Sequence, residues 1–327
     1  MLALIEITAW HWAGFILAVL FFLALDLGVF HRKAHVVQFK EALIWTSIWF
    51  TLSLAFAGAL VPLRGKEEAL EFLTGYIIEL SLSMDNVFVI ALIFSYFCVP
   101  LAYQHRVLFW GIIGALVMRG IMIGAGALLI QTFHWMLYVF GAFLVITGIK
   151  MIFASEEGVH PERNPVIRLA RRLFPIAPDF DGQKFFTQWK GQRALTPLAI
   201  VLLMVETTDL IFAIDSIPAI FAVTQKPFIV FTSNVFAILG LRSLYFVLAN
   251  AIGYFRYLKI GLSIVLVFIG VKMLIPLARG KIDLLKDFYL PTNVALFIVV
   301  GIIATSIIAS LIAAKCESDK KPGPPLK

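Results

Sequence analysis

The chain has 327 residues, of which 61% are hydrophobic, with a formal net charge of +7 and a mean hydropathy of +0.94. A soluble globular domain is about 45–50% apolar, so this composition excludes a water-soluble domain and indicates a protein whose main solvent is lipid. In such a protein, basic residues in cytoplasmic loops explain a positive charge better than nucleic-acid binding does.

The hydropathy pattern predicts an all-α multi-pass membrane protein with about nine transmembrane helices. Stretches of about 20 nearly uncharged residues are long enough to cross a hydrocarbon core of about 30 Å. The expected spans cover residues 11–30, 42–62, 70–97, 107–130, 134–153, 196–223, 228–251, 257–276 and 291–314. The third and sixth of these spans are the polar ones.

The segments outside the spans predict topology. The N-terminus has no basic residue before its first apolar run, so a cleaved signal peptide is not expected. Residues 154–195 form the one long connection, a basic, proline-containing surface segment with one short amphipathic helix. Most loop lysines and arginines lie on the side of this segment. The positive-inside rule therefore predicts a bacterial inner-membrane protein with its N-terminus outside and its C-terminus in the cytoplasm.

The two cysteines, Cys98 and Cys316, are not part of a CxxC pattern. The sequence therefore indicates neither a disulfide framework nor a thiolate metal site. Both cysteines fall on the predicted cytoplasmic side, where free thiols are expected. The tail that begins at Lys315 is short, charged and proline-rich, and we expect it to be disordered.

Two stretches of the chain resemble each other over three spans each. "ELSLSMDN", from Glu79, aligns with "DLIFAIDS", from Asp209. Downstream, Arg119 in "LVMRGIM" aligns with Arg242 in "LGLRSLY", and Lys150 aligns with Lys272 at almost the same spacing. Because three is an odd number of spans, the second copy must run through the membrane in the opposite direction. The sequence thus predicts an inverted repeat of spans 3–5 and 6–8, with a site at the interface of the two copies.

This repeat divides the chain into five parts. The expected parts are two N-terminal helices (1–69), the first three-helix repeat (70–153), a cytoplasmic loop (154–195), the second repeat (196–276), and the last helix with its tail (277–327).

The apolar spans contain carboxylates. A charged side chain at the centre of a lipid-facing helix costs about 2.5–3.5 kcal/mol, so these groups must face the interior and find cations, protons or water. The carboxylates are Asp26, Glu79, Asp85, Glu206, Asp209 and Asp215. The acids at 79 and 85, and those at 209 and 215, are six residues apart and would point about 120° from each other on a continuous helix.

Two interpretations of these acids remain open at this stage. In the first, Arg119, Arg242, Lys150 and Lys272 pair with them in a purely structural ion network. In the second, carboxylates left over from such pairing bind a divalent cation or protons. Pro218 in "DSIP" could interrupt the sixth span and free backbone carbonyls as further ligands. Asn234 in "FTSNVF" either lines the path or makes an interhelical hydrogen bond.

The donor types narrow the ion. The candidate metal ligands are Glu79, Asp85, Asn86, Glu206, Asp209, Asp215 and Ser216. Carboxylate, amide and hydroxyl oxygens suit Mn²⁺, Mg²⁺ or Ca²⁺, and the two spans contain no cysteine or histidine for Zn²⁺ or Cu⁺. The six histidines lie near span ends or in loops, and we expect them at the surface.

The motifs "ELSLSMDNVFVIALIFSYF", "VETTDLIFAIDSIPAIFAVT" and "NVFAILGLR" resemble the TerC family of integral membrane proteins, in its Alx-like branch, and cover nearly the whole chain. The resemblance implies a multi-pass inner-membrane protein related to the LysE-type exporter superfamily, with links to manganese export and to tellurium resistance. The family's acidic motifs carry over onto Glu79, Asp85, Asn86, Glu206, Asp209, Asp215 and Ser216. Where many relatives have a lysine after the first glutamate, this chain has Leu80.

The leading functional hypothesis is a Mn²⁺ exporter that exchanges the metal for protons by alternating access. It needs no cofactor, since Mn²⁺ is the substrate, and its partners are the metal, protons and the lipid bilayer; a homo-oligomer is left open. The alternatives are a transporter of tellurium oxyanions that uses Arg119 and Arg242, and a factor that assists membrane-protein assembly. An intramembrane aspartyl protease, which would use a pair of aspartates, is not expected, because neither Asp85 nor Asp215 lies in a GxGD motif.

Overall fold

The computed structural model describes residues 7–25, 38–153, 161–248, 257–279 and 290–320. Its elements are α1 (Ala9–Leu25), α2 (Phe39–Arg64), α3 (Lys66–Tyr96), α4 (Leu101–Thr132), α5 (Met136–Phe153), η2 (Pro161–Arg163), α6 (Pro165–Leu173), β1 (Phe186–Trp189), β2 (Gln192–Leu195), α7 (Pro197–Phe221), α8 (Pro227–Leu248), α9 (Leu258–Arg279) and α10 (Thr292–Lys320).

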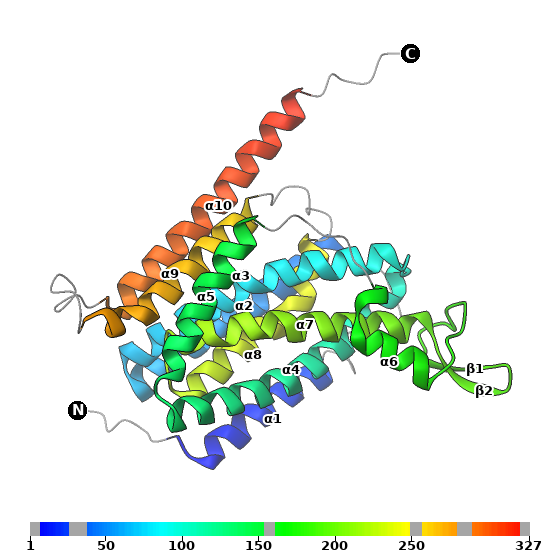
Figure 1. The fold of residues 1–327 in the computed structure, drawn as a ribbon, viewed down its shortest axis with the longest axis horizontal. Coiled ribbons are helices and arrows are strands. Elements are labelled where there is room, and N and C mark those ends of the chain that lie inside the picture. The colour runs from blue at the N-terminus through cyan, green and yellow to red at the C-terminus, as the bar shows by residue number, and fades with distance from the viewer. Residues whose placement is uncertain (1–6, 26–37, 154–160, 249–256, 280–289, 321–327) are drawn as a thin grey trace.

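The all-α membrane architecture is confirmed. In the described part of the chain, eight helices are long and apolar enough to cross a membrane, and α1 is a shorter apolar helix. In the view of Figure 1, α5, α9 and α10 run at a steep angle to α4 and α7, and the β-hairpin lies at one end of the bundle. We call that end the hairpin end, and the end that carries Lys226 the Lys226 end. The membrane orientation of these two ends stays a prediction.

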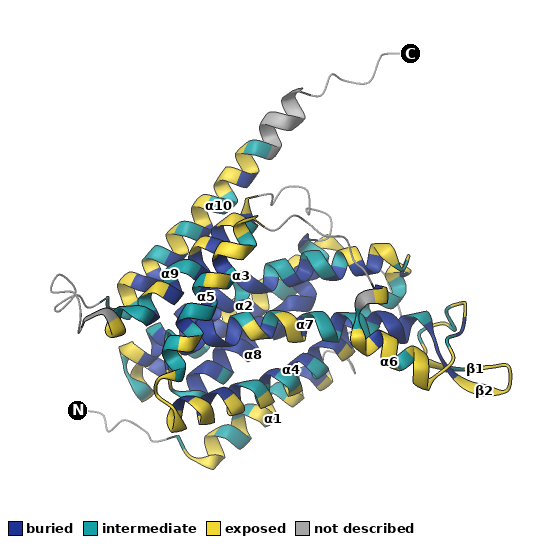
Figure 2. Cartoon of the chain, viewed as in Figure 1, coloured by how far each residue is buried: buried dark blue, intermediate teal, exposed yellow. Residues whose placement is uncertain are grey.

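Helix α8 is the centre of the bundle. It packs against α2, α3 and α4, and its side chains are buried along almost its whole length, including Ser233, Asn234 and Arg242 (Figure 2). Helices α1, α2 and α10 instead expose large apolar side chains such as Leu17, Ile44 and Phe297. A helix that is buried on all sides belongs to the core, whereas an apolar exterior is suited to contact with lipid.

The contacts between helices are compatible with the predicted inverted repeat, which stays a prediction. Helix α3 packs on α8, and α4 packs on α7, which are the pairs that exchanging the two copies would interconvert. The third helices of the copies, α5 and α9, form an extensive contact with each other. Gly141 and Gly270 lie at that contact, where a Cβ atom on Gly270 would come within 2.7 Å of the Gly141 carbonyl oxygen.

Two local features differ from expectation. Pro218 does not interrupt its span, because α7 continues through it to Phe221. Since proline has no N–H, it leaves the carbonyl of Ile214, beside Asp215, without its helical hydrogen bond. The long connection contains the expected short helix, α6, whose N-cap Asn164 accepts hydrogen bonds from the amides of Val166 and Ile167. It also contains an unpredicted hairpin of β1 and β2. Lys190 and Gly191 at its two-residue turn both have positive φ, as type I′ turns require.

A single glycine separates α2 from α3. Gly65 has φ of 96°, a backbone conformation that side chains disfavour. Its amide still bonds to the carbonyl of Val61, at the end of α2. The chain therefore leaves α2 and enters α3 within one residue, which brings Arg64 against the first turn of α3.

Replacing Gly270 by alanine should destabilise the protein by about 1–3 kcal/mol, because the added methyl group overlaps the Gly141 carbonyl oxygen as well as the amide and the side chain of Val145 on α5. Thermal unfolding of the purified protein measures the loss. The matched control is Gly124→Ala on α4, where a Cβ atom meets nothing within 4 Å. Equal melting temperatures for the two variants would contradict the close α5–α9 contact.

Candidate functional site

Arg119 lies at the centre of a buried polar cluster. It comes from α4 and is 2% exposed. Its Nε and Nη2 donate to the two carboxylate oxygens of Asp209 on α7, over 3.2 and 3.0 Å. Its Nη1 contacts the carboxylate of Glu79 on α3 and donates to the Ser216 hydroxyl at 3.3 Å. One guanidinium thus joins three helices, and two of them contribute a carboxylate.

Asn86 completes the cluster. Its Nδ2 donates to Asp209 Oδ1 at 3.0 Å. Exchanging the two predicted copies would place Asn86 on Ser216 and Asp209 on Glu79. The contact between Asn86 and Asp209 would then become the pair formed by Ser216 and Glu79, which share Arg119 Nη1. The repeat itself stays a prediction.

Helical geometry explains which predicted residues meet. Residues seven apart differ by about 20° around a helix, whereas residues six apart differ by about 120°. Asn86 therefore lies on the same stripe of α3 as Glu79, and Ser216 lies on the same stripe of α7 as Asp209. Asp85 and Asp215 lie on other faces of these two helices.

The remaining predicted acids lie apart from Arg119. Asp85 interacts electrostatically with Lys259 on α9. Asp215 hydrogen-bonds to Thr147 on α5. Glu206 is only partly buried and lies against Gly114 of α4, where a Cβ atom would overlap its carboxylate. Within the described residues, no group of three or more His, Cys, Asp or Glu side chains is placed to hold a metal.

The predicted supporting residues have different surroundings. Nη1 of Arg242 lies 3.1 Å from Nε2 of His105, so His105 is an interior contact and not the surface histidine that we expected. Lys150 is exposed, and Lys272 feels the charge of Glu71. Asn234 is buried, and neither of its amide atoms has a hydrogen-bond partner among the described residues. Asp26 lies outside the described residues.

Three oxygens on one stripe of α3 are buried without a hydrogen-bond partner in the described part of the chain. They are Glu79 Oε2, Ser83 Oγ and Asn86 Oδ1. Each such atom costs free energy because it has lost water and gained no partner. The stripe is therefore a set of oxygen donors with coordination capacity to spare, next to two carboxylates.

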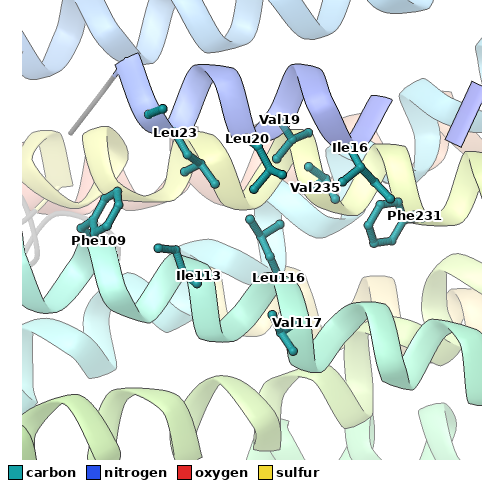
Figure 3. Close-up of a pocket in the computed structure, with 11 residues that line it drawn as sticks. Ile16, Val19, Leu20, Leu23, Phe109, Ile113, Leu116, Val117, Phe231 and Val235 are labelled. Carbon is teal, nitrogen blue, oxygen red and sulfur yellow. The ribbon is translucent and has the colours of Figure 1, made fainter. Parts of the chain in front are cut away.

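A small cavity connects Asp209 with Arg242. It has a volume of about 20 Å³ and is otherwise lined by apolar side chains and Gly111 from α3, α4, α7 and α8. This volume accommodates about one water molecule. Much larger is an apolar groove of about 400 Å³ between α1, α4 and α8 (Figure 3). Its lining contains no charged or polar side chain, so it does not belong to the ionic site.

A second ionic cluster, which the sequence analysis missed, closes the Lys226 end. Arg64 forms a bidentate pair with Glu68 at 2.8 and 2.9 Å. Lys226, which precedes α8, contacts Glu68 at 3.3 Å and Glu71 at 3.1 Å, and the Thr224 hydroxyl donates to Glu71 at 2.8 Å. Together they tie α2 and α3 to the connection between α7 and α8.

The hairpin end is covered by the long connection. Gln183 Nε2 donates to the Ala102 carbonyl at 3.3 Å, and Arg106 lies over the Phe185 ring at 5.3 Å from its centroid. The Arg119 cluster is therefore enclosed between an ionic closure at one end and this connection at the other.

Comparisons with known proteins agree with the geometry of a membrane protein. A profile described as the integral membrane protein TerC family matches residues 64–318. An uncharacterized membrane protein of Myxococcus xanthus, STKORF319, is 55% identical over 93% of this chain and 92% of its own length. The Escherichia coli K12 protein Alx, named as a proposed membrane-bound redox modulator, is 48% identical over 91% of this chain and 92% of its own. No solved structure matches the chain.

Replacing Asn86 by leucine should destabilise the protein by about 1–3 kcal/mol, because buried Asp209 loses a hydrogen bond. Ser81→Ala is the control: Ser81 is also buried on α3, but its hydroxyl bonds only to the carbonyl of Ile77 in its own helix. Thermal unfolding of both variants provides the comparison. If the leucine variant is as stable as the serine control, the Asn86–Asp209 contact does not contribute.

The Lys226 cluster predicts a pH dependence. Burial lowers the pKa of Lys226, but its hydrogen bond to Glu71 and the charges of Glu71 and Glu68 outweigh burial and raise the pKa above the ordinary 10.5. A raised pKa stabilises the fold below the unfolded value, and this contribution is lost as the pH rises through the folded value. The stability difference between wild type and Lys226→Met should therefore be constant below pH 10 and shrink above 10.5.

Unfolding at a series of pH values tests this prediction. Lys184→Met is the control, because Lys184 pairs with Asp181 at an exposed position, where ion pairs contribute little. A difference between wild type and Lys226→Met that stays the same up to pH 12 would show that the ammonium is not held by Glu68 and Glu71.

Proposed function

Because the chain belongs to the TerC family of integral membrane proteins, we propose that it exports a divalent metal cation, with Mn²⁺ as the substrate, in exchange for protons. The observation that carries this proposal is the convergence of two buried carboxylates, Glu79 and Asp209, on a single internal cation. These two residues occupy aligned positions in the two predicted copies of the repeat.

Charge balance supports a cation as the substrate. If Glu79 and Asp209 are both ionised, Arg119 leaves one negative charge uncompensated, and Glu206 lies one helical turn from Asp209 as a further acid. In an interior of low dielectric constant, such an excess favours binding of a cation or of protons. Arg119 supplies the positive charge in this conformation, and a divalent cation would supply it when the guanidinium withdraws.

The donor set suits a hard metal. Glu79 and Asp209 would provide carboxylate oxygens, Asn86 an amide oxygen, and Ser216 a hydroxyl. Oxygen donors of this kind are typical of Mn²⁺, Mg²⁺ and Ca²⁺ sites. The oxygens of Glu79, Ser83 and Asn86 that have no hydrogen-bond partner among the described residues would bind such an ion without giving up a hydrogen bond of their own.

Asp85, Glu206 and Asp215 are proposed to act outside this inner set. They lie on neighbouring faces of α3 and α7, where they would receive protons or pass the metal on as the helices move. Alternating access then needs one half of the bundle to move against the other around Glu79 and Asp209. Opening one end requires the Lys226 cluster to separate, and opening the other requires the long connection to move.

The geometry does not favour the rival functions. An oxyanion site would need a guanidinium that is not already paired with acids, yet Arg119 contacts both Glu79 and Asp209. The chain has no CxxC motif, the usual sequence pattern of a dithiol redox centre. Among the described residues, no contact favours a role in membrane-protein assembly.

Asp209→Asn should lower Mn²⁺ transport by about 10–100-fold or more, because it removes one charged ligand and half of the negative charge around Arg119. The measurement is uptake into proteoliposomes across a panel of Mn²⁺, Mg²⁺, Ca²⁺, Zn²⁺ and tellurite, with and without a pH gradient. Glu162→Gln is the matched control, since Glu162 is exposed in the connection. If wild-type protein moves none of the divalent cations, or if Asp209→Asn moves Mn²⁺ as fast as wild type, the proposal is wrong.

A further inference from the structure

A second arginine, Arg242, lines the same small cavity as Asp209. It projects from α8 and is 7% exposed, and the cavity has a volume of about 20 Å³. Its Nη1 lies 3.1 Å from His105 Nε2 on α4. Two arginines thus lie near one carboxylate, and Arg119 forms an ion pair with it.

The two arginines occupy aligned positions in the predicted copies. Arg119 lies on the second helix of the first copy and reaches the first helix of the other copy, α7. Arg242 lies on the second helix of the second copy, α8, which packs on the first helix of the other copy, α3. The two aligned arginines therefore make different contacts in this conformation. Arg119 pairs with Glu79 and Asp209, whereas Arg242 contacts His105.

We propose that Arg242 is the alternative counter-ion of Asp209. When Arg119 withdraws, Arg242 leaves His105, crosses the cavity and pairs with the Asp209 carboxylate. The obstacle is small, because the cavity holds only about one water molecule. Arg242 is thus a positioning residue that supplies the counter-charge of Asp209 in the conformation that Arg119 does not serve.

This change of counter-ion at Asp209 rests on the proposed transport function, which would give it its role. A buried carboxylate that loses its only cation is strongly destabilised, so a carrier must compensate the charge in each conformation that lacks the metal. Arg119 does so in this conformation, and Asn86 donates a further hydrogen bond to Asp209. Arg242 would do so from the wall of the cavity that includes Leu108 and Gly111, nearer the hairpin end.

A double-mutant cycle on the full-length protein in detergent tests the exchange without any transport measurement. The variants are Arg119→Gln, Arg242→Gln and the two combined, and the readout is the melting temperature. If either arginine can serve Asp209, each single variant is partly rescued by the other arginine, and the double variant loses more than the sum of the single losses. Contacting or functionally linked residues deviate from additivity in this way, whereas distant ones do not.

The control cycle combines Arg119→Gln with Arg64→Gln. Arg64 pairs with Glu68 at the Lys226 end and cannot replace Arg119, so these two losses should add. Equally additive losses for Arg119 and Arg242 would overturn the proposal.

A second variant keeps the test decisive if Arg119→Gln does not fold. Glu79→Gln combined with Arg119→Gln removes one carboxylate together with its cation and leaves Asp209 for Arg242. A cryo-electron microscopy structure of this double variant should place a guanidinium nitrogen of Arg242 within salt-bridge distance of Asp209. An Arg242 side chain still on His105, with Asp209 unpaired, would refute the exchange. Failure of wild-type Mn²⁺ transport would refute the proposed function and leave this structural result standing.

Discussion

The fold is organised around the ionic contact of Arg119 with Glu79 and Asp209. Charges inside an apolar bundle must be compensated, since an isolated buried charge costs far more than its packing returns. The bidentate contact with Asp209 and the contact with Glu79 fix how α3, α4 and α7 lie relative to one another. Asn86 donates a hydrogen bond to Asp209, and Ser216 accepts one from Arg119. These directional contacts orient the carboxylate and the guanidinium in addition to the attraction between their charges.

The same contact gives the bundle a potential for motion. The guanidinium of Arg119 links α4 to α3 and α7. A metal ion in its place would link α3 and α7 only, because it is not attached to α4. Under the proposed alternating access, the different contacts of Arg119 and Arg242 would belong to one of two related arrangements. The close contact of α5 with α9 at Gly141 and Gly270 would let the two halves remain attached while the site between them changes.

Both ends of the bundle are closed by means that differ chemically. At the Lys226 end, Glu68 and Glu71 form ion pairs with Lys226. Separating these pairs would leave two buried carboxylates without that cation, which is unfavourable. At the hairpin end, the cover is a connection held by a few hydrogen bonds and by Arg106 on Phe185. The two closures do not correspond under the predicted repeat, so the two ends are expected to open with unequal ease.

The sequence by itself determined the class of the protein, its approximate spans and a set of candidate polar residues that includes the members of the Arg119 cluster. An apolar run of about 20 residues crosses a lipid bilayer as a helix, because only a helix pairs all of its backbone N–H and C=O groups within one segment. Polar residues inside such runs, here Glu79, Asn86, Asp209 and Ser216, are therefore easily recognised. Only the tertiary structure decided that Arg119 pairs with Glu79 and Asp209, while Asp85 and Asp215 do not. Pairing depends on which stripe of a continuous helix faces which neighbour. The sequence left that open because a break at Pro218 would have turned Asp215 to another direction. The ionic closure at Lys226 and the contact of His105 with Arg242 were likewise invisible in the sequence, because they join residues from distant segments that only packing brings together.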